Sequence, residues 1–229
     1  MRSLAGYIIV TIILLLPQNS FGQLVPPGSL GPDAYFPSAA AAEQLLLLLP
    51  SPPAPGSAAQ AANITINNMV QATASPQALA QAQLEGSSYS VFSFSSVLGS
   101  GFNAQNLPVL ANFFNEVTIN TQNTNYELKD IYNSQGPQTA ASYPSTQALL
   151  GDINGVLLGY MLPQDATQLQ TFGVQFGLDR LIVNAHWPTD VGAAQMETGV
   201  LVSDLFASPQ FQSDFNAAKA ELQAEQSKK

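Results

Sequence analysis

The chain lacks most of the side chains that catalytic and metal-binding sites commonly use. Its 229 residues include no cysteine and a single histidine, His186. The absence of cysteine excludes disulfides, thiolate catalysis and thiolate metal sites, and one histidine excludes a histidine-rich metal cluster. We therefore predict neither a metal nor a cofactor.

Charge is also scarce, and positive charge is the scarcer kind. Only 9% of the residues are charged, and 6 Lys+Arg against 15 Asp+Glu give a net charge of −9. Such an acidic chain repels polyanions, which argues against a nucleic-acid partner. With 46% hydrophobic residues, the chain nevertheless has enough apolar material for one globular core.

Residues 1–22 predict a signal peptide. Arg2 supplies a positive start, residues 4–16 are mostly apolar, and Ser20 and Gly22 are the small residues at which a signal peptidase cleaves. Pro17 ends the apolar run well short of the roughly 20 residues that span a bilayer. We expect cleavage after Gly22, a secreted or periplasmic protein and no membrane span after cleavage. An uncleaved anchor is the alternative.

The remaining chain predicts an all-α fold in a single domain of roughly eight helices. Residues 23–44 are expected to form an N-terminal arm and the start of a first helix, and residues 45–229 the helical domain. The apolar run at 45–49 predicts the end of a buried helix. An amphipathic stripe at Leu110, Phe113, Phe114 and Val117 predicts one helix, and residues 121–133 a second. Ser57 is expected to cap a helix, Pro144 to be the first residue of a later one, and Ser208-Pro209 to begin the last.

Between residues 3 and 218 the only cationic side chains are Lys129 and Arg180. Arg180, His186 and Asp190 follow one another with the spacing Arg-x5-His-x3-Asp, and Pro188 breaks the helix between them. Asp190 could accept a hydrogen bond from one nitrogen of the His186 ring and leave the other free to attack. The alternative is a histidine with a purely structural role.

A second group of residues lies upstream, where residues 142–147 read Ser-Tyr-Pro-Ser-Thr-Gln. Ser145 there precedes a predicted helix, whose free backbone N–H groups favour an anion. Lys129 lies on what should be the neighbouring helix. Together these groups could surround a tetrahedral oxyanion.

These residues resemble the bacterial class A non-specific acid phosphatases, within the superfamily of type 2 phosphatidic acid phosphatases and vanadium haloperoxidases. That signature reads Lys-x6-Arg-Pro, Pro-Ser-Gly-His and Ser-Arg-x5-His-x3-Asp. The resemblance implies that His186 is the nucleophile that becomes a phosphohistidine and that Asp190 orients its ring. It further implies that Lys129, Ser145 and Arg180 hold the phosphoryl oxygens, and that the fold is the helical bundle of this superfamily.

The chain departs from the first two parts of the signature. Gly136 stands where the family has a phosphate-binding arginine, and Thr146-Gln147 replaces Gly-His. Gln147 cannot exchange a proton near neutral pH, so the general acid of the family is absent.

The sequence therefore predicts a secreted acid-phosphatase-like phosphomonoester hydrolase, impaired by these two losses. Its ligand would be a small phosphomonoester or inorganic phosphate, with vanadate as an analogue. A catalytically inactive phosphate-binding pseudoenzyme is the alternative. A structural protein without a ligand would leave Lys129, Arg180 and His186 unexplained, and the missing arginine and histidine also argue against a vanadate-dependent peroxidase.

Overall fold

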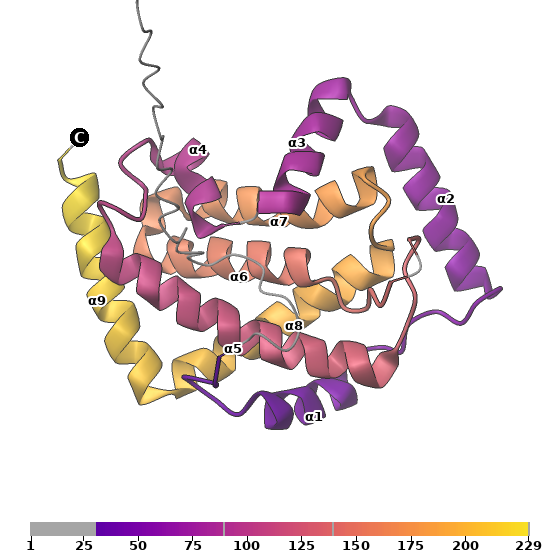
Figure 1. Ribbon diagram of the computed structural model, residues 1–229, viewed down its shortest axis with the longest axis horizontal. Helices are drawn as coiled ribbons and strands as arrows, with labels where there is room; N and C mark the ends of the chain where they lie inside the picture. The colour runs from indigo at the N-terminus through magenta and orange to yellow at the C-terminus, as the bar shows by residue number, and fades with distance from the viewer. Residues whose placement is uncertain (1–30, 89, 139, 229) are drawn as a thin grey trace, which may run out of the picture.

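A computed structural model of the chain describes residues 31–88, 90–138 and 140–228. These residues form α-helices and two short 3-10 segments, without a β-strand (Figure 1), which confirms the predicted all-α class. The predicted signal peptide and residues 23–30 of the predicted arm lie outside the described residues. None of the helices in the described ranges combines the length and the apolarity that a transmembrane segment requires. The helices are α1 (Ser38–Leu48), α2 (Ala58–Thr73), α3 (Pro76–Ser88), α4 (Ser95–Leu98), α5 (Pro108–Tyr132), α6 (Thr146–Met161), α7 (Ala166–Ile182), α8 (Pro188–Ala207) and α9 (Pro209–Gln226).

Helices α6 and α7 lie side by side at the centre of the bundle (Figure 1). Two glycines allow their close approach. A Cβ added to Gly151 would lie 2.5 Å from the carbonyl oxygen of Gly173, and one added to Gly173 would lie 2.4 Å from the carbonyl oxygen of Gly151. Any larger residue at either position would push the two backbones apart.

Helices α5, α8 and α9 enclose this central pair, and α1 packs along α5 (Figure 1). Aromatic side chains fill the end of the bundle where α8 turns into α9. The Phe113 ring contacts Phe211 and Phe215 with centroids 5.4 and 6.0 Å apart, and Tyr35 meets Phe211 edge to face at 5.2 Å. Such contacts add to the hydrophobic burial that stabilises the bundle.

Helices α2 and α3 lie beside this bundle, at the upper right of Figure 1. We call this helix pair the arm; it is distinct from the N-terminal arm predicted for residues 23–44. The arm reaches the bundle mainly through α7, with further contacts from α2 to α8. Residues 44–84 contain no charged side chain. The two buried residues of α2 are Asn63 and Asn67, so this helix turns a polar edge towards the bundle.

Helix α5 corrects the prediction of two helices between residues 108 and 133. One helix of 25 residues runs through residues 118–120, which lie between the two predicted helices. Asn120 is satisfied without interrupting it: its side chain accepts a hydrogen bond from the backbone N–H of Tyr35 at 2.7 Å and donates to the carbonyl of Phe36 at 2.9 Å. Tertiary partners therefore override the weak local preference for a break.

Two further expectations need correction. In the run at 45–49, Leu45 and Leu49 are buried but Leu47 is 88% exposed, because α1 presents only one face to α5. Pro144 precedes the helix instead of starting it: α6 begins at Thr146 with Ser145 as its N-cap. The predicted starts of helices after Ser57 and at Pro209 are confirmed.

Candidate functional site

Four helix ends meet on the side of the bundle nearest the arm (Figure 1). Helices α5 and α7 end here, while α6 and α8 begin here. The motif residues that the sequence singled out lie in these helix ends and in the loops that join α5 to α6 and α7 to α8. Backbone hydrogen bonds link the two loops to these helix ends, so the candidate site is part of the framework of the fold.

Lys129 lies in the last turn of α5 and is only 8% exposed. Its Nζ donates to the carbonyl oxygens of Ser142 at 2.9 Å and Pro144 at 2.5 Å, just before α6. Burial lowers the pKa of Lys129 to about 8, against the opposing effect of the acidic groups Glu197 and Asp190. The ammonium group is therefore mostly charged at acidic and neutral pH, with two of its three donors bound to backbone.

Ser145 is fully buried between the loop and α8. Its Oγ accepts from the N–H of Ala148 at 3.4 Å, and its own N–H donates to the carbonyl of Asp190 at 3.1 Å. The second and third motif segments are therefore joined directly through backbone. The Ser145 hydroxyl caps α6 in this arrangement.

His186 is 7% exposed and lies just before α8. Its Nδ1 is 3.5 Å from Oδ2 of Asp190, longer than an ordinary hydrogen bond, and the same oxygen accepts from the N–H of Trp187 at 2.9 Å. Burial lowers the pKa of His186, the positive charges of Lys129 and Arg180 act in the same direction, and Asp190 opposes them. The net effect favours the neutral form of the imidazole, which is the nucleophilic one.

Arg180, near the end of α7, is also buried but points towards the arm. Its Nη2 donates to the carbonyl of Ala82 on α3 at 2.6 Å, and its Nε is a buried donor without a hydrogen-bond partner. Burial lowers the pKa of Arg180 while Asp179 and Glu85 raise it. The charge of Arg180 also contributes to the lowered pKa of His186, although its side-chain hydrogen bond goes to Ala82 on α3.

The asparagines of α2 also contact the site, a role the sequence analysis did not assign. Asn67 donates through Nδ2 to the backbone carbonyl of His186 at 2.9 Å and to Oδ1 of Asn184 at 3.0 Å. Asn63 donates to Oγ1 of Thr189 at 3.0 Å. Their spacing of four residues places both on one face of α2, and that spacing was the available signal in the sequence.

A buried polar relay lies beside Lys129 and was also missed. Thr146 donates from Oγ1 to Oδ1 of Asn125 at 2.7 Å, and Asn125 donates from Nδ2 to Oε2 of Glu197 at 2.9 Å. Glu197 on α8 is fully buried, and burial raises its pKa to about 8 despite the lowering effects of Asn125 and Lys129. The signal in the sequence was an acidic residue inside the mostly apolar stretch that forms α8.

The two positions that depart from the family signature have different surroundings. Gly136 is crowded: an added Cβ would lie 2.7 Å from Cβ of Ser142 and 3.1 Å from the carbonyl oxygen of Ala185. Gln147 is half-buried in the first turn of α6. A side chain at position 136 therefore requires the loop to shift, whereas position 147 already holds a long side chain.

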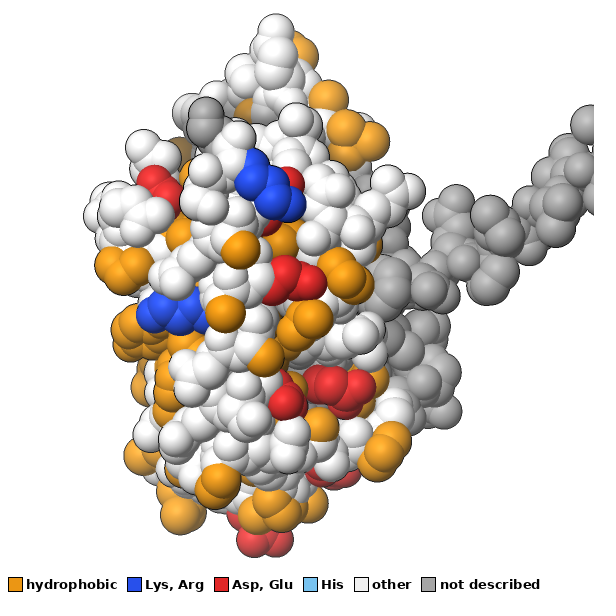
Figure 2. Space-filling model, turned by 90° about the vertical axis from the view of Figure 1, so that its left-hand side faces the viewer, with side chains coloured by type: hydrophobic (Ala, Val, Ile, Leu, Met, Phe, Trp, Pro, Cys, Tyr) orange, Lys and Arg blue, Asp and Glu red, His pale blue; other side chains and the backbone are white. Residues whose placement is uncertain are grey.

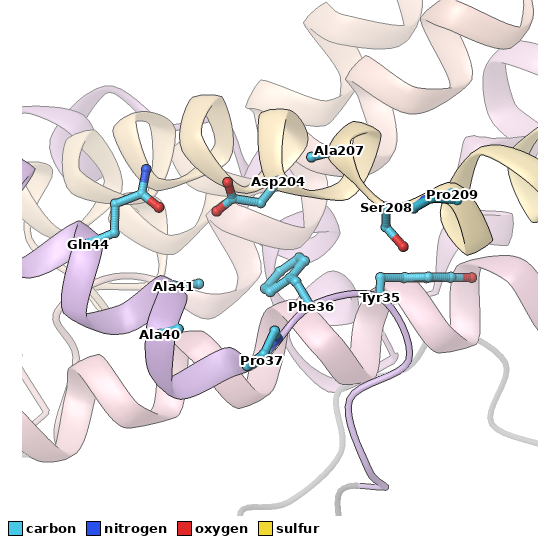
Figure 3. Close-up of a pocket in the computed structure, with 10 residues that line it drawn as sticks. All are labelled: Tyr35, Phe36, Pro37, Ala40, Ala41, Gln44, Asp204, Ala207, Ser208 and Pro209. Atoms are coloured by element: carbon cyan, nitrogen blue, oxygen red, sulfur yellow. The ribbon is translucent and has the colours of Figure 1, made fainter.

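A cavity of about 500 Å³ adjoins the site. It is lined by the prolines at 52, 53 and 55 together with Tyr132, Gly136 and Trp187, and none of the described residues that line it is charged. A groove of about 450 Å³ lies between α1 and the corner of α8 and α9 (Figure 3). Phe36 and Asp204 face each other across that groove, and none of the predicted site residues lines it.

Positively charged side chains are also scarce on the face of the molecule that Figure 2 presents. Figure 2 shows scattered acidic side chains and few cationic ones on the face it presents. Inside the molecule, by contrast, Lys129 and Arg180 are both buried. Two of the few cations of the chain therefore lie beneath the surface, at the candidate site.

Comparison with known proteins finds similarity to acid phosphatases over part of the chain, while no family model matches. A non-specific acid phosphatase of Providencia stuartii is 31% identical over 81 residues, which cover 35% of this chain and 33% of that protein. A non-specific acid phosphatase of Salmonella typhi is 29% identical over 109 residues, 48% of this chain and 40% of that protein. An acid phosphatase of Zymomonas mobilis is 28% identical over 89 residues, 39% of this chain and 34% of that protein. The chain thus spans well under half the length of the curated relatives it matches, and these distant similarities support a relationship to acid phosphatases.

Proposed function

We propose that the chain is an acid-phosphatase-like phosphomonoester hydrolase that acts through a phosphohistidine on His186. The observation that supports this proposal is that the one imidazole, Lys129 and Arg180 are all buried near the helix ends on one side of the bundle. The partial similarity to acid phosphatases supports the same substrate class.

His186 is the nucleophile in this mechanism. Its depressed pKa keeps the ring neutral, and the contact of Nδ1 with Asp190 leaves Nε2 to attack phosphorus. The P–N bond forms as the ester P–O bond breaks, and the electron pair leaves on the ester oxygen. Water then attacks phosphorus, the P–N bond breaks and inorganic phosphate departs.

Lys129, Ser145 and Arg180 are assigned to the phosphoryl oxygens. Lys129 has one N–H donor beyond the two that its backbone contacts occupy, and Nε of Arg180 is a further donor. Cationic donors of this kind stabilise the charge that develops on a transferring phosphoryl group. No metal or cofactor takes part in these steps.

The leaving group sets the substrate class. Gln147 cannot protonate a departing alkoxide, and general acid help is typically worth about 10²–10⁴-fold. Aryl phosphates avoid this loss because a phenolate departs without a proton. The adjoining cavity, with Tyr132, Trp187 and prolines in its wall and no charged lining, suits an uncharged aryl group.

A phosphate-binding pseudoenzyme is the second candidate function. It is favoured by the crowding at Gly136, which leaves no space for the arginine of the family, and by the engagement of Lys129 with backbone carbonyls. We also propose that the protein is exported, because residues 1–22 have the pattern of a signal peptide.

The test is hydrolysis of an aryl phosphate by the purified protein between about pH 4 and pH 7. We expect turnover that His186→Ala abolishes, and a gain of about 10²-fold or more with alkyl phosphates in Gln147→His, which restores a general acid. Gln147→Asn is the matched control and should bring no gain. Turnover that survives His186→Ala would overturn the phosphohistidine. Vanadate binding without turnover would favour the second candidate.

A further inference from the structure

The arm has one charged side chain, and that side chain is buried against the bundle. Residues 44–84 carry no charge, and the first acidic residue that follows is Glu85 on α3, 6% exposed. Helix α3 packs on α7 at this point. A lone acid on an uncharged arm would ordinarily face water, so its burial calls for a partner.

The partner is Asp179 on α7, which is itself 1% exposed. Each carboxyl group accepts a hydrogen bond from a glutamine four residues earlier in its own helix: Gln81 Nε2 to Glu85 Oε1 at 2.6 Å, and Gln175 Nε2 to Asp179 Oδ1 at 2.7 Å. The other oxygens, Glu85 Oε2 and Asp179 Oδ2, are buried without a bond to any other side chain. The two carboxyl groups lie close enough to act on each other, and a hydrogen bond between these two oxygens would satisfy both.

Such a bond between two carboxyl groups requires a proton on one of them, because two carboxylates in contact repel each other. Burial and Asp179 raise the pKa of Glu85 to about 7, while Gln81 and Arg180 act in the lowering direction. Glu85 is therefore the protonated partner at acidic pH. The charged groups that face it are Asp179 and Arg180, both on α7; α2 and the described side chains of α3 contribute no other.

Arg180 ties this pair to the candidate site. Its guanidinium lies against α3, since Nη2 donates to Ala82 and a Cβ added to Gly86 would lie 2.5 Å from Nη1. Ala82 and Gly86 flank Glu85 within one turn of α3. The position of the guanidinium thus depends on α3 remaining docked on α7.

We propose that Glu85 is a positioning residue: a proton shared between Glu85 and Asp179 docks α3 on α7 and thereby holds the Arg180 guanidinium in place. When that proton is lost, two carboxylates face each other beside a single guanidinium, and α3 separates from α7. The docking itself is independent of catalysis, whereas its effect on turnover rests on the function proposed above. Arm docking and hydrolysis would then fail together as the pH rises above about 7.

Hydrogen exchange of the α3 amides, measured without substrate and corrected for the intrinsic effect of pH, tests the docking. We expect protection in the wild-type protein to fall about tenfold between about pH 6 and pH 8, since with a docked pKa of about 7 the proton favours docking about tenfold at pH 6 and hardly at all at pH 8. In Glu85→Gln the side-chain amide can donate to Asp179 at every pH, so its protection should not change with pH. Equal protection of wild-type α3 at both pH values would overturn the proposal.

Two further variants make the result specific. Asp179→Asn removes the other carboxylate and should flatten the pH dependence of α3 hydrogen exchange in the same way. This variant provides the test if Glu85→Gln does not fold. Asp152→Asn is the matched control, because Asp152 on α6 is a second buried carboxyl group whose pKa is raised to about 7 by burial alone. Its α3 exchange should follow the wild type, and a flattened profile there would contradict the role given to Glu85.

The hydrolysis assay separates this proposal from the proposed function. If Glu85→Gln extends aryl phosphate turnover to higher pH, both stand. If the exchange data behave as expected but the protein never hydrolyses phosphate esters, the docking stands and the hydrolase proposal fails. If exchange is flat while hydrolysis occurs, the docking proposal alone fails.

Discussion

The two interior cations are buried in surroundings of different kinds. Lys129 lies in what we call the core junction, formed with Asn125, Thr146 and Glu197 from α5, α6 and α8. Arg180 lies in the arm contact, formed with Ala82, Glu85 and Asp179 from α3 and α7. In each region the cation donates to backbone carbonyls and lies near an acid whose pKa is raised, to about 8 for Glu197 and about 7 for Glu85.

The two regions differ in how firmly the helices that form them are packed into the protein. The core junction joins three long helices of the bundle, and the hydrogen bond from Ser145 to the Asp190 carbonyl closes it. The arm contact joins the bundle to a helix pair that packs mainly on α7, with fewer contacts from α2 to α8. A perturbation of the core junction should therefore unfold the protein as a whole, while one in the arm contact should act locally.

Replacement of Lys129 should have the largest effect. Lys129→Met removes the donor to Ser142 and Pro144 and the charge beside Glu197, and we expect a loss of about 3 kcal/mol in the free energy of unfolding. Vanadate binding should disappear as well, because the side chain is one of two cations in the site. Urea denaturation and vanadate titration measure the two effects.

Arg180→Met is the matched variant for this comparison. We expect it to lower the free energy of unfolding by only about 1 kcal/mol, since the arm can separate from α7 while the bundle remains folded. It should instead raise hydrogen exchange in α3. If Lys129→Met and Arg180→Met lower the free energy of unfolding equally, the arm unfolds together with the bundle, which would contradict this comparison.

The sequence allowed the core junction to be predicted only in part. Lys129, Ser145 and Asp190 match the signature on which the predicted resemblance rests. The structure connects them, because Nζ of Lys129 donates to the Pro144 carbonyl and the N–H of Ser145 donates to the Asp190 carbonyl. Glu197 and Glu85 belong to no motif. An acid in a helix normally faces water, and only tertiary packing decides which acids are buried, so spacing alone could not identify these two.

The same limit explains the errors in the fold. The helix starts at Ser57 and Pro209 were predictable because capping is a local effect of three or four residues. The continuity of α5 was not, because Asn120 is satisfied by Tyr35 and Phe36, more than 80 positions earlier in the chain. Crowding at Gly136 likewise depends on Ala185, which the chain reaches only after two further helices.

Acidic pH should stabilise both regions, to different extents. The pKa of Glu197 is raised from 4.5 to about 8 and that of Glu85 from 4.5 to about 7, so the folded state binds these protons more tightly than the unfolded state does. Their stabilising contribution is full below pH 4.5 and is lost as the pH rises through the folded-state values. We expect a fall of about 2 kcal/mol in the free energy of unfolding between about pH 5 and pH 8.

Denaturation of the wild-type protein and of Glu85→Gln at several pH values shows how much of this fall in the free energy of unfolding comes from each region. If the core junction dominates global stability, Glu85→Gln should retain most of the fall. A variant that no longer responds to pH would assign the loss to the arm contact, against the comparison drawn above.

The smallest effect should come from two matched helix caps. Ser145 caps α6 in the core junction, with Oγ 3.4 Å from the N–H of Ala148, and Ser75 caps α3 in the arm, with Oγ 3.1 Å from the N–H of Ala78. Ser145→Ala should lower the free energy of unfolding by about 1 kcal/mol, because a buried N–H loses its acceptor, and should lower Tm by about 2–4 °C. Ser75→Ala breaks the shorter bond, yet water can replace the exposed hydroxyl and the arm can fray alone, so Tm should change by less than about 1 °C while exchange of the first α3 amides rises. The reverse order of the two Tm shifts would mean that bond length, and not the region in which the cap lies, sets its contribution.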